Sequence, residues 1–289
     1  VDVSSSEPVE IGRHQTRGWA LGVTVSGTRA YVADAFRGLS VVDVANPAAP
    51  SAVSGWEQAG TQAARVAALG SMVLLADRNL GLFILDVSLA TPAVLGSHHP
   101  LGTAVAFAVE GRHAYVTSGF AGLTVVDVSN PAAPIELATI DTRGYFAEHV
   151  AVVANTAYVT VRHTDRGDEV HIIDVSDPRF PRRLGVYSYF DHQRSRGAAY
   201  RDIAVVNQIA HIPTEWGIEL IDVSDPANPV TASYTDLDVA VEDGSLTFAI
   251  ASDGATSYVV AGRRGLIVVD VADAAKPVVL PNYTTGDYV

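Results

Sequence analysis

The sequence predicts an all-β protein that folds as a β-propeller of six four-stranded blades. Three observations lead to this prediction. A strand that ends in Asp-Val recurs six times, short alternating runs of β-branched and polar residues flank each copy, and Gly, Asn or Pro separates the runs. Because one such sheet cannot bury both of its faces, neighbouring copies are expected to pack around an axis until a ring closes.

The repeated strand places an aspartate at equivalent positions, 41 to 48 residues apart: Asp43, Asp86, Asp127, Asp174, Asp222 and Asp270. The motif reads GLSVVDVANPAAP at 38–50 and GLTVVDVSNPAAP at 122–134. We expect the aspartate to accept hydrogen bonds from backbone N–H groups of the following turn. The strand before it repeats Ala-Tyr-Val, so Tyr31, Tyr115 and Tyr158 are expected to pack in the core.

Each repeat carries four strands, which in the first repeat are predicted at 20–27, 29–36, 38–44 and 51–58. The whole chain, 1–289, is expected to be a single propeller domain. Its repeats cover about 16–58, 59–100, 101–143, 144–190, 191–236 and 237–285, after a partial copy at 1–15.

Closure of the ring has two sequence interpretations. Both 9–14 and 276–285 are typical of a fourth strand. Either one of them adds a fifth strand to the last blade, or the N-terminal piece is the remnant of another blade. Six blades are favoured, with seven as the alternative.

The motif VVDVSNPAAP at 125–134 resembles the LVIVD repeat, a β-propeller family of bacterial and archaeal exported or surface proteins. The resemblance covers nearly the whole chain. It implies the propeller fold and an extracytoplasmic location, that is periplasmic, secreted or on the cell surface. It implies little about chemistry, because one fold hosts many functions.

Composition excludes several classes of partner. A net charge of −13 argues against nucleic acid and against an anionic membrane surface, since both require a basic face. No apolar stretch approaches the roughly 18 residues of a membrane span, so no membrane insertion is expected. The chain has no cysteine, which excludes disulfides and thiolate metal sites. It begins at Val1 without a signal peptide, so we expect a mature or trimmed product.

Function is expected where one repeat departs from the others. The extra length lies in the loops 161–169, 187–202 and 233–245. In an up-and-down blade, the loop between strands two and three and the connection into the next blade emerge on one side. Binding and catalytic residues are therefore expected on this side, because loops on a rigid scaffold carry most such groups.

The first strands of the six repeats also differ from one another. Just before the first core residue, the aligned position reads Gly22, Arg65, Ala106, His149, Asp202 and Thr247. We expect His149 to carry a proton, Asp202 to orient it, and Arg65 to stabilise developing negative charge. Tyr200 completes the catalytic candidates. The alternative is that these residues satisfy buried backbone groups or bind trapped water in the central channel.

One residue earlier, the otherwise apolar position holds Glu148 and Arg201 in adjacent repeats. Successive strand residues face opposite ways, so these two lie on the other side of the strand from His149 and Asp202. We expect them to form a buried ion pair between blades that supports the site.

The loops supply candidate binding residues: Trp19, Asp34, Arg37, Asp77, Arg78, Tyr145, His163, His192, His211, Trp216 and Arg264. Aromatic rings beside arginines suit an anionic or polyhydroxylated ligand, through stacking and paired hydrogen bonds. The alternative is an ordinary solvated loop surface. No cofactor motif is present. A divalent metal could bind His149 and Asp202 with His211, although no ligand spacing supports such a site.

Two functions follow from these features. The favoured one is an enzyme that uses acid–base chemistry, as a lyase, isomerase or hydrolase, on a small or sugar-like anionic substrate. The alternative is a non-catalytic surface propeller that binds a protein or a glycan. A purely structural spacer is a third interpretation, but it leaves the lengthened loops unexplained.

Overall fold

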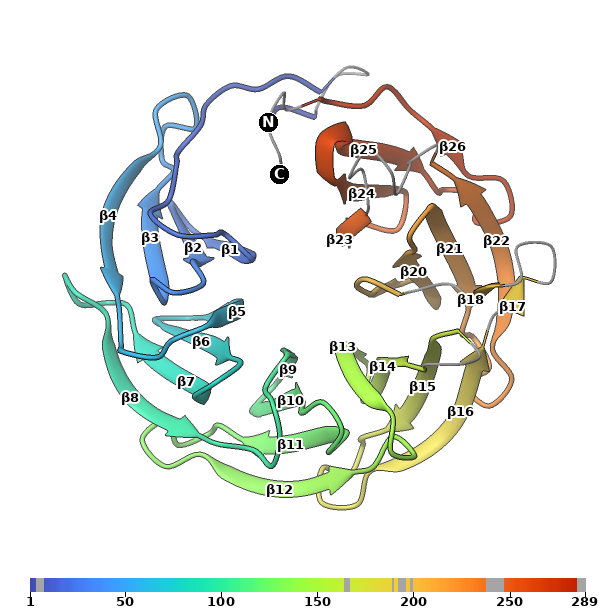
Figure 1. Cartoon of the computed structure of the whole chain (residues 1–289), viewed down its shortest axis with the longest axis horizontal. Helices are drawn as coiled ribbons and strands as arrows, with labels where there is room; N and C mark the ends of the chain where they lie inside the picture. The colour runs from blue at the N-terminus through green and yellow to red at the C-terminus, as the bar shows by residue number, and fades with distance from the viewer. Residues whose placement is uncertain are drawn as a thin grey trace. The chain divides into compact units, whose positions relative to one another are not determined.

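The computed structural model describes residues 1–3, 8–163, 167–188, 190–191, 196–197, 200–237 and 247–284. Its strands form six four-stranded antiparallel sheets, labelled in Figure 1, which are the blades of a β-propeller and confirm the predicted fold. Within each blade, every strand pairs with the strand that follows it in the chain. Each blade is therefore built from hairpins.

The first three blades span most of the N-terminal half. Blade 1 consists of β1 (Gly22–Ser26), β2 (Arg29–Ala33), β3 (Leu39–Asp43) and β4 (Ser51–Trp56). Blade 2 consists of β5 (Ala63–Leu69), β6 (Met72–Asp77), β7 (Gly81–Asp86) and β8 (Ala93–His98). Blade 3 consists of β9 (Ala106–Glu110), β10 (His113–Thr117), β11 (Leu123–Asp127) and β12 (Ile135–Ile140).

The remaining blades carry the additions to the repeat. Blade 4 consists of β13 (Phe146–Val153), β14 (Thr156–Arg162), β15 (Glu169–Asp174) and β16 (Arg182–Ser188). A short hairpin, β17 (Phe190–Asp191) and β18 (Arg196–Gly197), precedes blade 5. Blade 5 consists of β19 (Ala204–Val206), β20 (Ile209–Pro213), β21 (Gly217–Asp222) and β22 (Val230–Asp236). Blade 6 consists of β23 (Thr247–Ser252), β24 (Thr256–Ala261), the 3₁₀ turn η2 (Gly262–Arg264), β25 (Gly265–Asp270) and β26 (Val278–Val279).

The motif aspartate has the structural role that was predicted. In every blade its Oδ1 accepts a hydrogen bond from the backbone N–H two residues later, over 2.8 to 3.0 Å. In blade 2 the Ser88 hydroxyl donates to Asp86 as well, and these side-chain and backbone hydrogen bonds lower the pKa of Asp86. The aspartate therefore fastens the turn that leads into the fourth strand.

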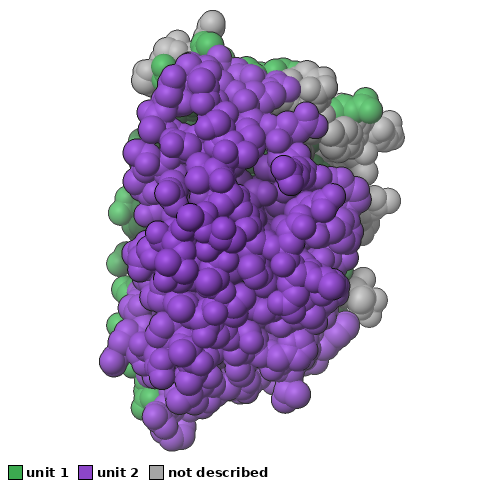
Figure 2. Space-filling view, turned by 90° about the vertical axis from the view of Figure 1, so that its left-hand side faces the viewer, with its two compact units in different colours: residues 1–9, 148–177, 181–289 green, residues 10–147, 178–180 purple. Residues whose placement is uncertain are grey.

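The chain divides into two compact units (Figure 2). Unit 1 comprises Val1–Val9, Glu148–Asp177 and Pro181–Val289, and unit 2 comprises Glu10–Ala147 and Pro178–Phe180. Each unit buries its core between neighbouring blades. In unit 1 the clusters join blade 4 to blade 5 and blade 5 to blade 6, and in unit 2 they join blade 1 to blade 2 and blade 2 to blade 3.

The repeated tyrosines lie in the core, as predicted. Tyr31, Tyr115 and Tyr158 are all buried. Packing between blades is the physical reason, because Tyr31 belongs to the cluster between blades 1 and 2 and Tyr158 to the cluster between blades 4 and 5. The recurring sequence positions are thus explained by folding alone.

The C-terminal segment supplies the fourth strand of blade 6. β26 pairs with β25, and Tyr283 exchanges two backbone hydrogen bonds of 2.8 Å with Leu266. At the other end of the chain, Asp2 forms a bridge to Val9. A Cβ on Gly12 would meet the carbonyl oxygen of Pro47, as one on Gly96 would meet that of Pro131 on the next blade. The residues around Gly12 therefore lie against the proline turn of blade 1 as a fourth strand would.

Among the described residues, no helix is both long and apolar enough to cross a membrane. The expected extracytoplasmic location stays a prediction.

Candidate functional site

The two loop types that were expected to share one side do meet in unit 2. The backbone N–H of Ala63, in the connection into blade 2, donates to the carbonyl of Ala35, in the loop between strands two and three of blade 1, over 3.1 Å. Ala147 and Gly119 make the same contact over 3.0 Å. We call this side, where first strands begin and second strands end, the loop edge.

His149 and Asp202 come together at the loop edge of blades 4 and 5. His149 Nδ1 lies 3.5 Å from Asp202 Oδ1, and each side chain is 16% exposed. The backbone N–H of His149 donates to the Thr160 hydroxyl over 3.0 Å, and Asp202 Oδ2 accepts from the N–H of Ile250 in blade 6 over 3.3 Å. Contacts within three blades therefore hold the two side chains facing each other, where they are largely shielded from solvent but still reachable.

The expected ion pair between Glu148 and Arg201 is replaced by pairs inside each blade. Glu148 pairs with Arg162 at the end of β14, and Arg201 Nη2 lies 2.9 Å from Glu215 Oε1. The Arg162 side chain is largely exposed. The correction has a geometric reason, because first and second strands are adjacent within a blade and bring such residues together before blades meet.

A buried carboxylate, Glu219 on β21, lies below this edge. Its side chain is fully buried, and it accepts hydrogen bonds from the hydroxyls of Tyr187, on β16, and Tyr200. The Tyr200 bond measures 3.0 Å, and Tyr187 also lies 2.6 Å from the Thr231 hydroxyl. We refer to Glu219, Tyr187, Tyr200 and Thr231 as the Glu219 cluster. It joins blade 4 to blade 5 through polar groups at the centre of an apolar interface.

Tyr200 is held by hydrogen bonds at its side-chain hydroxyl and at its backbone N–H. Its backbone N–H donates to Asp168 Oδ2 over 2.9 Å, while Asp168 Oδ1 accepts from the N–H of His163 over 3.1 Å. Tyr200 is buried, so it is placed to support the loop edge rather than to touch a substrate. Two residues further along the chain is Asp202, which this anchoring positions.

Burial controls the ionisation of the cluster. It raises the pKa of Glu219 to about 7, although the hydrogen bonds from Tyr187 and Tyr200 act in the opposite direction. The pKa of Tyr200 is raised well above its usual value, first by burial and then by the charge of Glu219. The pKa of Asp168 is also raised by burial. A proton on Glu219 is therefore the form that the interior favours.

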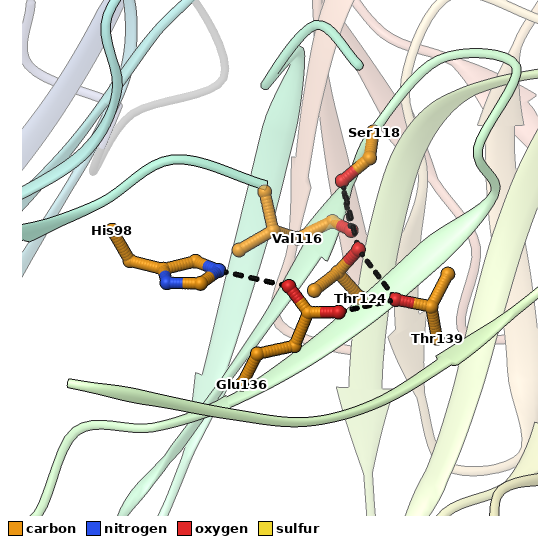
Figure 3. A network of polar contacts seen from close by, with 6 residues as sticks. All are labelled: His98, Val116, Ser118, Thr124, Glu136 and Thr139. Atoms are coloured by element: carbon orange, nitrogen blue, oxygen red, sulfur yellow. Dashed lines mark hydrogen bonds and ion pairs between the residues drawn. The ribbon is translucent and has the colours of Figure 1, made fainter. Parts of the chain in front are cut away.

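The Glu219 cluster was not predicted from the sequence, because its signal lies on the third strands of the repeats and the predicted residues came from the first strands. The third residue of each GLSVVDV-like strand also differs from one repeat to the next. It reads Ser40, Phe83, Thr124, His171, Glu219 and Ile267. In blade 3 this position holds a small polar residue that bonds neighbouring hydroxyls. Thr124 lies 3.1 Å from the Ser118 hydroxyl and 3.2 Å from that of Thr139 (Figure 3).

Another His–carboxylate pair offers a comparison for His149. His98 Nε2, on the outer strand β8, lies 3.0 Å from Glu136 Oε2 on β12 (Figure 3). The His98 side chain is 16% exposed, like that of His149, but Glu136 is also bonded to Thr139. This pair connects two fourth strands, whereas His149 lies on a first strand and Asp202 just before one.

The predicted binding aspartates are structural. Asp34 and Asp77 are fully buried at the ends of their second strands. Asp34 accepts from the N–H of Gly18 and from the Ser40 hydroxyl, and Asp77 accepts from three backbone N–H groups. Both carboxylates therefore hold loop backbone in place.

The other predicted residues are spread over both units. Arg65 lies half-buried on β5 of unit 2, opposite Ala76. At the loop edge of unit 2, the exposed residues are Trp19, Arg37 and Arg78, and Tyr145 is half-buried. In unit 1 the half-buried ones are His163, Trp216 and Arg264. His192 and much of the lengthened loops lie outside the described residues.

His211 is a core residue. It occupies the position that the other repeats give to Tyr31, Tyr115 and Tyr158, and it is buried with Nδ1 2.9 Å from the Ser257 hydroxyl. Burial lowers its pKa to about 4. His211 therefore faces blade 6 in its neutral form, and no cluster of three or more metal-ligating side chains occurs in the described part of the chain.

The register of blade 6 differs from the sequence alignment. The first-strand position aligned with His149 was Thr247, but β23 has a bulge, and Ala249 pairs with Val260 as Gly22 pairs with Ala33. The equivalent of His149 in blade 6 is therefore Ala249. It lies two residues beyond Thr247, and the bulge accounts for one of the two.

Comparison with solved structures supports the fold. A functionally unknown protein from Desulfotomaculum acetoxidans has a TM-score of 0.73 at 11% identity, and the match covers 96% of this chain and 90% of that one. A Bacteroides fragilis protein provisionally assigned as a 6-phosphogluconolactonase has a TM-score of 0.71 at 11% identity, with 93% and 85% covered. Raptor from Chaetomium thermophilum has a TM-score of 0.75 at 11% identity, with 95% and 25% covered. Likeness at these identities shows the fold alone.

No curated protein matches the sequence. The family model of the LVIVD repeat, in contrast, matches residues 17–56, 60–97, 101–142, 145–188, 198–236 and 250–285. Each match corresponds to one blade, and together they cover most of the chain. This protein belongs to the LVIVD repeat family.

Proposed function

We propose that this protein is an enzyme that performs acid–base chemistry on a small anionic substrate at the loop edge of blades 4 and 5. The observation that carries the proposal is the His149–Asp202 pair. A His and a carboxylate 3.5 Å apart are both reachable, and both depart from the small residues that blades 1, 3 and 6 carry at that position, Gly22, Ala106 and Ala249.

The two residues have distinct roles in this proposal. Asp202 faces Nδ1 and sets the orientation of the imidazole, so Nε2 is the nitrogen that exchanges a proton with the substrate or with an attacking water. Backbone N–H bonding from Ile250 keeps Asp202 in place during that exchange. A lyase, an isomerase and a hydrolase all use such a proton carrier.

The Glu219 cluster supports these residues from below. Tyr200 ties the strand that bears Asp202 to the interior through Glu219 and Asp168. Tyr200 is therefore proposed as a positioning residue. Arg65 belongs to unit 2, and the proposal does not depend on it.

The proposal is tested by turnover of anionic sugar derivatives. Hydrolysis of 6-phosphogluconolactone is a suitable first assay, since the substrate belongs to the proposed class and a fold relative is provisionally assigned that activity. Elimination on uronate oligosaccharides and aldose–ketose isomerisation of sugar phosphates cover the other two reaction types.

The decisive comparison is between two histidines. His149→Ala should lower turnover by about 100-fold or more, which is the usual contribution of a general acid or base. His98→Ala, which removes an equally exposed His from another carboxylate pair, should leave turnover unchanged. If none of the three reactions is accelerated, or if both variants behave alike, the proposal is wrong.

A further inference from the structure

Unit 2 contains an open hollow of about 650 Å³ that the acid–base proposal does not use. Its lining consists of residues 57–61, Phe36 and Asn79. These come from the loop between strands two and three of blade 1, the connection into blade 2, and the corresponding loop of blade 2. The volume lies in the range of sites that hold a small molecule or one to two sugar rings.

The walls of the hollow are fixed by hydrogen bonds that do not involve a ligand. Thr61 N–H donates to the Gln58 carbonyl over 3.2 Å, and the side-chain amide of Asn79 donates to the Gly60 carbonyl over 2.9 Å. Gly60 has a φ of +84°, and a Cβ there would meet no atom within 4 Å. The connection therefore has a defined turn with open space above it, so a ligand would not have to order it.

One side of the hollow is aromatic and exposed. Phe36 lines it and is 57% exposed, and Trp19, which is 70% exposed, packs edge-on against Phe36 with ring centroids 5.7 Å apart. Two large aromatic side chains left in water are a cost to the free protein, and such pairs commonly mark a binding surface. A flat apolar ligand face would cover them.

The rest of the lining is polar, and its one charged residue, Glu57, is paired with an arginine. Glu57 pairs with Arg37 at 3.2 Å, and Gln58 adds a neutral amide. Thr61 is only 3% exposed, and its hydroxyl has no hydrogen-bond partner among the residues that the structure describes. An unpaired buried hydroxyl is unfavourable, and a ligand hydroxyl entering the hollow would relieve that cost after a small rotation of the side chain.

We propose that this hollow binds a neutral sugar residue of a glycan. The apolar face of the sugar ring lies on Phe36, and its hydroxyls bond to Gln58, Thr61 and the free oxygen side of the Asn79 amide. A sugar combines an apolar face with a rim of hydroxyls, which matches an aromatic wall beside neutral amides. The inference is independent of the His149–Asp202 proposal.

The chain provides a matched control. Phe120 is the equivalent of Phe36 in blade 3. It is 70% exposed and contacts Phe146 edge-on with ring centroids 5.1 Å apart. It does not line the hollow. Because Phe36 and Phe120 are both exposed, replacing either one should leave the protein folded, which thermal melting would verify.

The experiment is calorimetric titration of the full chain with hexasaccharides of glucose, xylose, mannose and N-acetylglucosamine, and with a hexauronate as the charged comparison. At least one neutral hexasaccharide should bind. Phe36→Ala and Gln58→Ala should weaken that binding, the former by about tenfold, whereas Phe120→Ala should change it by less than about twofold.

Titration with the matching monosaccharide distinguishes the source of the ligand. Binding of the hexasaccharide alone indicates a polymer, and equal binding of both indicates a free sugar. Each result supports the site if Phe36→Ala weakens the binding and Phe120→Ala does not. The proposal is overturned if no neutral sugar binds, if only the hexauronate binds, or if the two phenylalanine variants weaken binding equally. Turnover by the His149 site is measured separately, so failure of either proposal leaves the other intact.

Discussion

Replacing Glu219 by Gln should change how the stability of the protein depends on pH. Glu219 is fully buried between blades 4 and 5, and burial raises its pKa from 4.5 to about 7. In the unfolded chain the group ionises at its ordinary pKa. Between these two values the folded protein therefore binds a proton that the unfolded chain has lost, and stability falls as pH rises through this window.

The size of the effect follows from the shift. A difference of 7 − 4.5 = 2.5 units, at about 1.36 kcal/mol per unit, amounts to about 3 kcal/mol of stability that is present below pH 4.5 and lost above pH 7. Gln cannot ionise and can still accept a hydrogen bond from one of the two tyrosines. The free energy of unfolding of Glu219→Gln, taken relative to that of wild type, should therefore be about 3 kcal/mol higher at pH 8 than at pH 4.

Urea denaturation at a series of pH values measures this difference. The comparison between variant and wild type cancels the titration of all other groups, and Glu57→Gln, at an exposed carboxylate, is the control. A free-energy difference between Glu219→Gln and wild type that stays constant from pH 4 to pH 8 would refute the assignment of a buried, protonated Glu219.

His211→Tyr should change the pH dependence of stability in the opposite sense. Burial lowers the His211 pKa from 6.5 to about 4, so about 3 kcal/mol of folding stability is present above pH 6.5 and lost as pH falls to 4. Urea denaturation of the variant should not show this loss of stability in acid. An unchanged acid limb would contradict the buried neutral form. Tyr187→Phe removes the hydroxyl that bonds Glu219 and should cost about 1 to 2 kcal/mol, and a denaturation midpoint equal to that of wild type would count against the cluster. Thr61→Val should be neutral or stabilising by about 1 kcal/mol in the ligand-free protein, because the replaced hydroxyl is buried without a partner, and a clear loss of stability would show that it has one. Gly96→Ala should cost about 1 to 3 kcal/mol, since its Cβ would meet the Pro131 carbonyl, and a thermal melt that matches wild type would disprove that close approach.

Two structural features at the loop edge bear on any later design of variants. Asp34 and Asp77 bond loop backbone from buried positions, so substituting them tests folding and not binding. His149 and Asp202 are reachable, so substituting them tests chemistry. The distinction rests on burial and on hydrogen-bond partners, which residue type alone does not reveal.

The sequence by itself determined the blade and its repetition. The motif aspartate followed by its turn, the alternation of the strands and the buried tyrosines are local patterns, and local patterns are decided by hydrogen bonds within a few residues and by the period of the strand. It also pointed to His149 and Asp202, because both depart from the repeat at one position, and the structure places them 3.5 Å apart.

Only the tertiary structure decided which polar side chains pair. Glu148 and Arg201 were expected to bond each other, but each pairs with a residue of its own blade. Glu219 was not predicted from the sequence, and it lies at the centre of a buried cluster. The reason is that spacing along the chain does not tell whether a side chain finds its partner inside its own blade, as Glu148 and Arg201 do, or on the neighbouring blade, as Glu219 does with Tyr187. A one-residue bulge such as that in β23 also changes which side chains face one another. Both are decided only when the strands and blades pack.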